Sequence, residues 1–153
     1  MRVINFNSNI VINLYEPKWT MKSTSIARKV IKACNLKRKG VSIILSNDKE
    51  VQRLNYQWRG KNKPTNVLSF PNDVKNTNYL GDIILAYETL KKEANEGNIL
   101  FVSHMSHLLI HGILHLKGYN HEKRKEEKTM QNEEIRILKT LSIDNPYKNQ
   151  RLV

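Results

Sequence analysis

Three histidines in the last third of the chain have the spacing of ligands for one metal ion. His115 follows His111 by four residues, and His121 comes six residues later. If this segment is helical, the first two imidazoles lie one turn apart on the same face and can reach a single ion. Gly118 follows Leu116, the last apolar residue of the pattern, and can end the helix in a left-handed conformation so that His121 turns back over that face. The spacing predicts three neutral imidazoles and an open fourth position, as in catalytic zinc sites.

The same predicted helix is largely apolar and carries two further histidines, His104 and His107. Its apolar side chains predict a mostly buried helix. They are Phe101, Val102, Met105, Leu108, Leu109, Ile110, Ile113, Leu114 and Leu116. Buried imidazoles need hydrogen-bond partners, so we interpret His104 and His107 as structural histidines. An isolated histidine pair one turn apart is more often ordinary, and the metal prediction therefore depends on the third histidine and the glycine.

The three histidines and the glycine also match the spacing of the metzincin protease signature. In those proteases a glutamate directly after the first histidine acts as the general base, whereas this chain has Gly112 there. The side chain that activates water for peptide cleavage is therefore missing. We predict a zincin-like metal-binding helix that serves a different reaction.

The charge of the chain favours a polyanionic partner. Lys and Arg number 26 against 14 Asp and Glu, which gives a net charge of +12. The excess is concentrated between Lys18 and Lys63, where Asp48 and Glu50 are the only acidic residues, and it includes a basic turn at 37–40. Such a block favours nucleic acid, although lysine-rich helices can also serve solubility alone.

Length and composition suit a single domain over residues 1–153. With 39% hydrophobic residues, the chain can bury a core and is not expected to be disordered. It has no run of about 18 apolar residues that would indicate a membrane span, and its N-terminus is typical of a strand rather than a signal peptide. The lone Cys34 is expected to be a buried thiol. We expect a cytoplasmic protein without a membrane partner and with a loosely held tail from about Asp144.

The elements that must position the histidines are predicted in the order β-α-β-α-β-β-α-α-α. Strands are expected in 3–14 (one or two, interrupted at 7–9), 41–46, 67–70 and 80–86. Helices are expected at about 20–36, 47–59, 88–96, 101–116 and 122–141. The connection between the last two strands allows an antiparallel pair. We predict an α+β fold with a small mixed sheet of about four strands and about five helices packed against it.

Three stretches carry a more specific pattern. They are LNYQWRGKNKPTNVLSFP at 54–71, LGDI at 80–83 and HLLIHGILHLKGYNH at 107–121. Together they resemble the YbeY family of bacterial metal-dependent endoribonucleases. The resemblance implies a zinc ion held by His111, His115 and His121, and a functional arginine at Arg59. It also implies a single-strand-specific endoribonuclease that acts in 16S rRNA 3′-end maturation and ribosome quality control, with precursor rRNA and the small ribosomal subunit as partners and no DNA.

Two positions depart from the family pattern as the resemblance defines it. The family usually has Asp where this chain has Asn120, and it often has Asp in place of Asn62 and Asp or Asn at Asn66. Asparagine keeps a hydrogen-bonding side chain but loses a negative charge, which can weaken ligand orientation or metal affinity. All three histidines are retained, so the metal prediction stands.

The mechanistic hypothesis is metal-assisted hydrolysis of a phosphodiester in single-stranded RNA. The metal would lower the pKa of its bound water, and Arg59 would donate to the phosphate oxygens where charge develops. Lys61 and Lys63 would extend a phosphate-tracking groove. Tyr56 and Trp58 offer stacking faces, but we interpret them as core residues.

Two alternatives stay open. One is a non-catalytic RNA- or ribosome-binding assembly factor with a structural metal, and the other is a zinc hydrolase of small substrates. Zn²⁺ is the expected ion, although three imidazoles also suit nickel, copper and iron. Asp82, at the start of a predicted strand, is interpreted either as a residue that orients a metal-bound histidine or as a strand-end residue.

Overall fold

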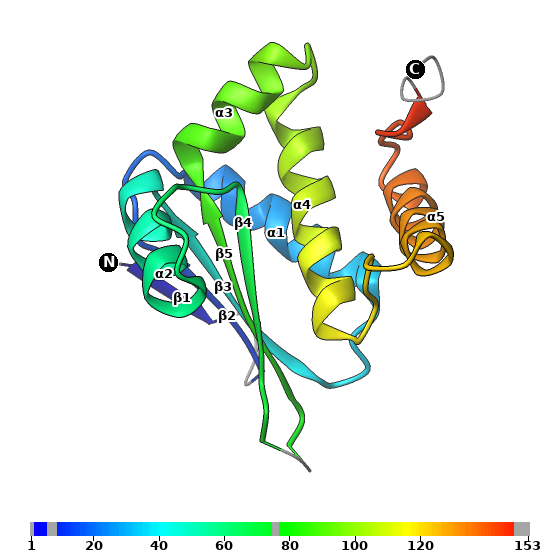
Figure 1. Cartoon of the computed structure of the whole chain (residues 1–153), viewed down its shortest axis with the longest axis horizontal. Helices are drawn as coiled ribbons and strands as arrows, with labels where there is room; N and C mark the ends of the chain where they lie inside the picture. The colour runs from blue at the N-terminus through cyan, green and yellow to red at the C-terminus, as the bar shows by residue number, and fades with distance from the viewer. Residues whose placement is uncertain (1, 6–8, 75–76, 149–153) are drawn as a thin grey trace.

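The structure, a computed structural model, describes residues 2–5, 9–74 and 77–148 and has a mixed sheet with helices on both faces (Figure 1). The strands are β1 (Arg2–Asn5), β2 (Ile10–Leu14), β3 (Gly40–Ser46), β4 (Val67–Pro71) and β5 (Tyr79–Ala86). The helices are α1 (Met21–Cys34), α2 (Asp48–Arg59), α3 (Tyr87–Glu96), α4 (Phe101–Leu116) and α5 (Arg124–Thr140). The predicted α+β class and the five helices are confirmed.

The described sheet has five strands instead of about four, in the order β1-β2-β3-β5-β4. The difference arises because the N-terminal segment contributes two strands, which pair antiparallel with Ile4 opposite Ile12. The predicted interruption between them falls at 7–9, of which residues 7 and 8 lie outside the described residues. The central strands β2, β3 and β5 are parallel, and β4 pairs antiparallel with β5 as expected.

Helices α1 and α4 pack on one face of the sheet and α2 packs on the other. Successive side chains of a strand point to opposite faces. Ile43 and Leu45 of β3 therefore join the larger apolar cluster with α1 and α4, whereas Ile44 packs with Val51 of α2 in the smaller one. Cover on both faces explains why the middle of β3 has three consecutive apolar residues, Ile43, Ile44 and Leu45.

Helix α4 crosses the sheet very closely at Gly112. A Cβ atom at this position would lie 3.0 Å from Ser69 Oγ on β4 and 3.2 Å from Ile83 on β5. Position 112 therefore faces the sheet, and any longer side chain would have to displace strand residues. Close packing of helix on sheet thus gives a structural reason for the missing glutamate that distinguishes this chain from metzincin proteases.

The end of α4 is the left-handed cap predicted at Gly118. Gly118 has φ +103°, and its N–H donates to the carbonyl of His115 at 3.0 Å. The N–H of Tyr119 donates to the carbonyl of Leu114 at 3.0 Å, which completes a Schellman motif. This cap reverses the chain directly after His115.

The buried thiol predicted for Cys34 is confirmed, with 4% of the residue exposed. Burial raises the pKa of this thiol to about 12, so it stays protonated at neutral pH. The Cys34 carbonyl accepts a hydrogen bond from Lys117 Nζ at 2.9 Å. This bond ties the C-terminal end of α1 to the C-terminal end of α4.

Helices α3 and α4 meet at a sharp bend. Within the described residues, no single helix is long and apolar enough to cross a membrane. Helices α3 and α4 reach that length and apolar character only when they are counted together, and a bend of 119° separates them.

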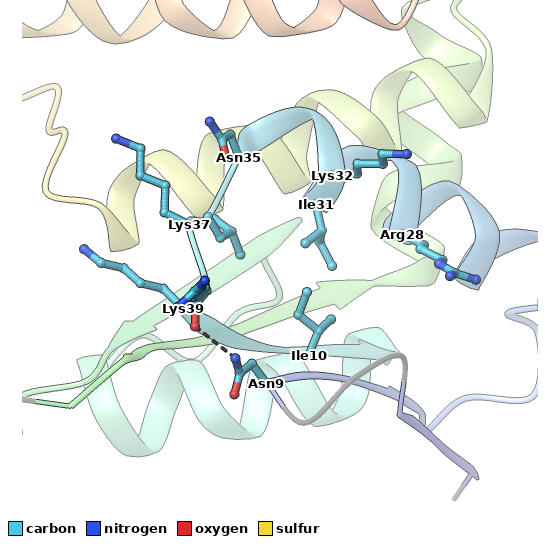
Figure 2. Close-up of a pocket in the computed structure, with 10 residues that line it drawn as sticks. Asn9, Ile10, Arg28, Ile31, Lys32, Asn35, Lys37 and Lys39 are labelled. Carbon is cyan, nitrogen blue, oxygen red and sulfur yellow. Dashed lines mark hydrogen bonds between the residues drawn. The ribbon is translucent and has the colours of Figure 1, made fainter.

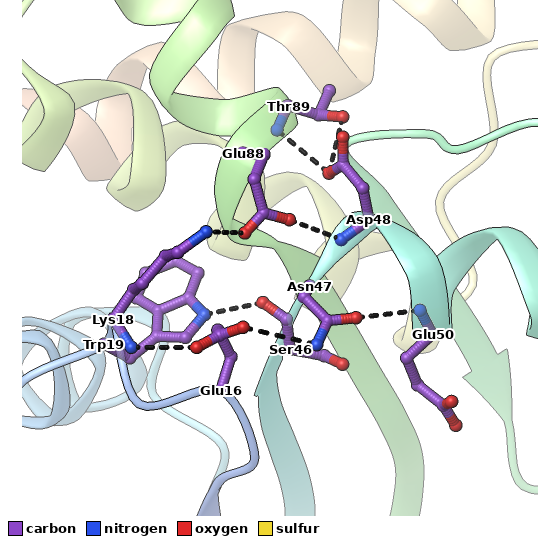
Figure 3. A network of polar contacts seen from close by, with 9 residues as sticks. All are labelled: Glu16, Lys18, Trp19, Ser46, Asn47, Asp48, Glu50, Glu88 and Thr89. Carbon is purple, nitrogen blue, oxygen red and sulfur yellow. Dashed lines mark hydrogen bonds and ion pairs between the residues drawn. The ribbon is translucent and has the colours of Figure 1, made fainter.

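The N-termini of α2 and α3 cap one another (Figure 3). Asp48 accepts hydrogen bonds from the N–H of Thr89 at 3.0 Å and from its hydroxyl at 2.8 Å. In return, Glu88 accepts from the N–H of Asp48 at 2.7 Å and forms an ion pair with Lys18 at 3.1 Å. Asn47 closes the first turn of α2 by accepting from the N–H of Glu50 at 2.8 Å. Two carboxylates at two positive helix ends are stabilising.

Replacing Asp48 by alanine removes the acceptor that closes the first turn of α3. We expect the free energy of unfolding to fall by about 1–2 kcal/mol, because the N–H of Thr89 loses its partner. Asp48→Asn keeps an acceptor oxygen and should lose less. Urea denaturation followed by circular dichroism measures all three proteins, and wild-type stability in the alanine variant would contradict this capping role.

Candidate metal centre

The structure brings together the three predicted histidines. One ligand atom each of His111, His115 and His121 lies within 4.8 Å of the other two. His111 and His115 project from α4, and His121 comes back over them in the loop that follows the Gly118 cap. The first two rings are partly buried, whereas His121 is exposed, so the cluster is open to solvent on one side.

The spacing of the ring nitrogens fits a small cation. Nε2 of His111 and Nε2 of His115 are 3.1 Å apart. Two nitrogens bound to one tetrahedral zinc at ~2.0 Å would lie about 3.3 Å apart. Two nitrogen lone pairs facing each other at this distance repel unless a proton or a cation lies between them. The cluster could therefore hold a metal ion, and its three described members leave further coordination positions for other ligands.

A buried carboxylate fixes the orientation of one of these rings. Glu134 of α5 is fully buried, with 0% of the residue exposed. Its oxygens accept from His111 Nδ1 at 2.9 Å and from His107 Nε2 at 2.7 Å, and the hydroxyl of Tyr147 donates to it as well. Because Nδ1 of His111 is used in this bond, Nε2 is the nitrogen left to face the cluster. A carboxylate behind a ligand histidine also increases the basicity of that ligand.

Glu134 is ionised in spite of its burial. Burial alone raises the pKa of this carboxyl, but hydrogen bonds from His107, His111 and Tyr147 outweigh it and hold the pKa at about 2. An ionised carboxylate is an acceptor only, so both imidazoles must donate to it. Burial and the bond to Glu134 in turn raise the pKa of the Tyr147 hydroxyl, which remains a donor.

The environment of His115 favours its neutral form. Burial lowers the pKa of this imidazole, and the neighbouring His111 and His121 lower it further. Neutral imidazole is the form that coordinates a metal.

Glu134 and Tyr147 also belong to the site, although neither was predicted from the sequence. The position of Glu134 between the buried Met130 and Ile137 is the signal, because a carboxylate on a buried face needs donors. Tyr147 offers no such signal, since nothing in its local sequence relates it to α5.

The other two histidines of α4 have the partners expected of structural histidines. His104 Nε2 lies 2.9 Å from Glu93 Oε1, and Glu93 accepts another hydrogen bond from Asn66 at 3.0 Å. His107 lies 2.7 Å from Glu134. His107 therefore shares with His111 the carboxylate that orients the His111 ring.

Arg59, Lys61 and Lys63 lie together in a second hollow, between the end of α2, the loop after it and α3. The Asn55 side chain holds this loop by donating to the Lys63 carbonyl at 2.9 Å. Glu93 lines the same hollow and contacts His104, which lies two helical turns before His111 on α4. The hollow that holds the three cations therefore adjoins α4 near His104, and it is separate from the hollow lined by His111 and His121.

Tyr56 and Trp58 differ from their expected roles, and the structure decides between the two interpretations of Asp82. Tyr56 and Trp58 were expected in the core, but they are 60% and 65% exposed. The ring centroid of Trp58 nevertheless lies 6.4 Å from that of Phe70 on β4. Asp82 accepts its described hydrogen bond from the hydroxyl of Tyr79 in the same strand. This contact fits the strand-end interpretation, and the histidine-orienting role belongs to Glu134.

The asparagines that depart from the family pattern have separate surroundings. The side-chain oxygen of Asn62 accepts from Gln52 Nε2 at 3.0 Å, so it helps to hold the loop on α2. Asn120 is exposed, directly before His121. An uncharged side chain at either position is compatible with the contacts that the described residues make.

Comparisons with known proteins agree with one another. The family model described as "Endoribonuclease YbeY" matches residues 5–142. A protein named endoribonuclease YbeY from Ehrlichia chaffeensis is 42% identical over 148 residues, covering 90% of this chain and 96% of its own. The protein of that name from Magnetococcus marinus is 47% identical over 120 residues, 70% of this chain and 82% of its own. The solution structure of TM1509 from Thermotoga maritima superposes with a TM-score of 0.59 at 27% identity, over 86% of this chain and 91% of its own.

Glu134→Gln is expected to weaken metal binding by about 10- to 100-fold, because an amide cannot accept from both histidines and the tyrosine with a full negative charge. Isothermal titration with Zn²⁺ measures the affinity. Glu133→Gln is the matched control, since Glu133 is the preceding residue and pairs with Arg136 on the surface. Equal affinities of the two variants would contradict the orienting role of Glu134.

Proposed function

This chain belongs to the YbeY endoribonuclease family, and on that premise we propose that it is a metal-dependent endoribonuclease whose ion is held by His111, His115 and His121. The observation that carries the proposal is the convergence of three imidazoles on one point that is backed by a buried carboxylate and open to solvent. The segment matched by the family model contains all three histidines and Arg59.

The donor set fits zinc. Three neutral nitrogen ligands with a remaining open position are typical of catalytic zinc sites, whereas a structural site normally adds a fourth Cys or His. When bound, such an ion activates water at neutral pH and polarises a phosphoryl oxygen. No cysteine lies in the described cluster, and the buried Cys34 belongs to α1.

The residues of the chain divide the remaining work. Glu134 holds His111 in the tautomer whose Nε2 faces the ion, and the cap at Gly118 brings His121 to the solvent side. Arg59 offers a planar set of donors that suits a phosphate, and Lys61 and Lys63 add positive charge beside it. A phosphodiester strand that passes from this hollow along α4 would reach the histidine cluster.

We further propose that the substrate is single-stranded RNA, and specifically precursor rRNA of the small subunit, where the enzyme acts in 16S rRNA 3′-end maturation and ribosome quality control in the cytoplasm. The net charge of +12 supports a polyanionic substrate. A non-catalytic assembly factor with a structural metal is the alternative, and a peptide-cleaving hydrolase is disfavoured because a protease-type general base has no room at Gly112.

Removing the metal or His111 is expected to abolish RNA cleavage. The ion contributes several kcal/mol of transition-state stabilisation, so chelation or His111→Ala should slow cleavage of a labelled single-stranded RNA by at least about 1,000-fold. Adding Zn²⁺ back should restore the chelated wild type but not the variant. Cleavage that persists in both would refute a metal-dependent nuclease.

Arg59→Ala is expected to lower the rate constant of cleavage by about 100- to 1,000-fold, because donors to the developing charge act mainly in the transition state. The affinity for RNA should change far less. Arg53→Ala is a control from the same helix, because Arg53 pairs with Glu50 away from the hollow. A loss confined to RNA affinity would instead favour the non-catalytic assembly factor.

A further inference from the structure

A second basic hollow lies at the other end of α1 from its N-terminal cap, beside the start of β2 (Figure 2). We call it the α1 hollow and define it by the cations that line it: Arg28, Lys32, Lys37, Arg38 and Lys39. Arg28 and Lys32 extend from α1 on one side, and Lys37 and Lys39 extend from the turn before β3 on the other (Figure 2). Its volume is about 310 Å³.

Four of the five cations of the α1 hollow form no ion pair with a described residue. None of the described residues that line it is acidic, and the structure shows no ion pair for Lys32, Lys37, Arg38 or Lys39 with any described residue. Cations elsewhere on the surface do pair, as Arg136 does with Glu133. Like charges gathered around a hollow raise the local potential and favour an anionic ligand.

The turn that presents two of these cations has a conformation better suited to glycine. Lys37 has φ +50° and Arg38 has φ +69°, and the N–H of Lys39 donates to the Leu36 carbonyl at 3.1 Å. Positive φ at both central residues defines a type I′ turn, which favours Asn and Gly. The Asn9 side chain fixes this turn by donating to the Arg38 carbonyl at 2.9 Å. Lys37 and Arg38 therefore occupy positions where most residues other than glycine strain the backbone.

The α1 hollow is joined to the helix that carries the histidines. Lys117, two residues beyond His115, donates to the carbonyl of Cys34, which lies in sequence between the lining residues Lys32 and Asn35. Figure 1 shows the end of α4 beside the segment that follows α1. The Arg59 hollow instead adjoins α4 near His104. From His104 to Lys117 the helix rises about 20 Å, and His111 and His115 lie between the two basic regions.

We propose that the α1 hollow binds backbone phosphates of the same single-stranded RNA, at a distance from the phosphate that is cleaved. The inference rests on the proposed function only in taking RNA as the substrate. At the ~3.4 Å rise of a stacked strand, about six nucleotides separate the two ends of this path along α4. The α1 hollow then acts as an anchor that contributes to affinity and not to the chemical step.

The test uses the double variant Lys37→Gly with Arg38→Gly. Glycine suits both left-handed positions, so the variant loses two cations without losing the turn, and its melting temperature should equal or exceed that of the wild type. Binding of a labelled RNA of about 16 nucleotides to the zinc-loaded protein is measured by fluorescence anisotropy over a range of salt concentrations. We expect affinity to fall by roughly tenfold and the slope of log K against log salt to decrease in magnitude by about 1.4.

The matched control is Lys91→Ala with Lys92→Ala, which removes the same charge from α3, where Glu88 and Glu96 are neighbours. This control should keep the wild-type slope. An RNA of about 4 nucleotides is too short to reach the α1 hollow and the histidine cluster at once, so the glycine substitutions should lower its affinity less than that of the longer RNA. Equal affinity and equal slope for the glycine variant and the lysine control on the longer RNA would overturn the anchor.

Cleavage of the same samples, followed on gels, separates this inference from the proposed function. If the wild type cleaves RNA and the glycine variant binds RNA as tightly as the wild type, the proposed RNA binding at the α1 hollow is wrong and the proposed nuclease activity stands. If the wild type binds RNA more tightly than the glycine variant but does not cleave it, RNA binding at the α1 hollow is supported and the proposed nuclease activity is wrong.

Discussion

The structure around the histidines depends on the charge of Glu134. An ionised carboxylate in the interior loses several kcal/mol of hydration, and it is stable there only if its oxygens are satisfied by good donors. His107, His111 and Tyr147 supply these donors from two other segments of the chain. One carboxylate therefore ties α5 and the segment after it to α4, and its bond to Nδ1 of His111 leaves Nε2 of that ring to face the histidine cluster. The hydrogen bond between Glu134 and His111 thus both orients the His111 ring and holds α5 against α4.

The rest of the site follows from how α4 is held. The absence of a side chain at Gly112 allows the helix to lie directly on β4 and β5, and the left-handed Gly118 reverses the chain so that His121 reaches the other two rings. The glycine that brings the helix close to the sheet also removes the protease base. The chain thus shares its histidine spacing with proteases but has no general base at that position.

Much of this could be predicted from local patterns. Alternating and helical periodicities identify β3, α2 and α4 because each buries a regular face, and the histidine cluster follows from spacing within one helix and one turn. Glu134 and Tyr147 could not be assigned in the same way, because their contacts join segments that are remote in sequence. The exposure of Tyr56 and Trp58 was missed for a related reason, since aromatic residues on a short helix do not indicate which of its faces the sheet will cover.

The most direct test of the account is the X-ray absorption spectrum of the zinc-loaded protein. Three imidazole nitrogens at about 2.0 Å with one further light ligand from solvent would agree with an open site held by His111, His115 and His121. A sulfur ligand, a fourth protein ligand, or fewer than three imidazoles would contradict it.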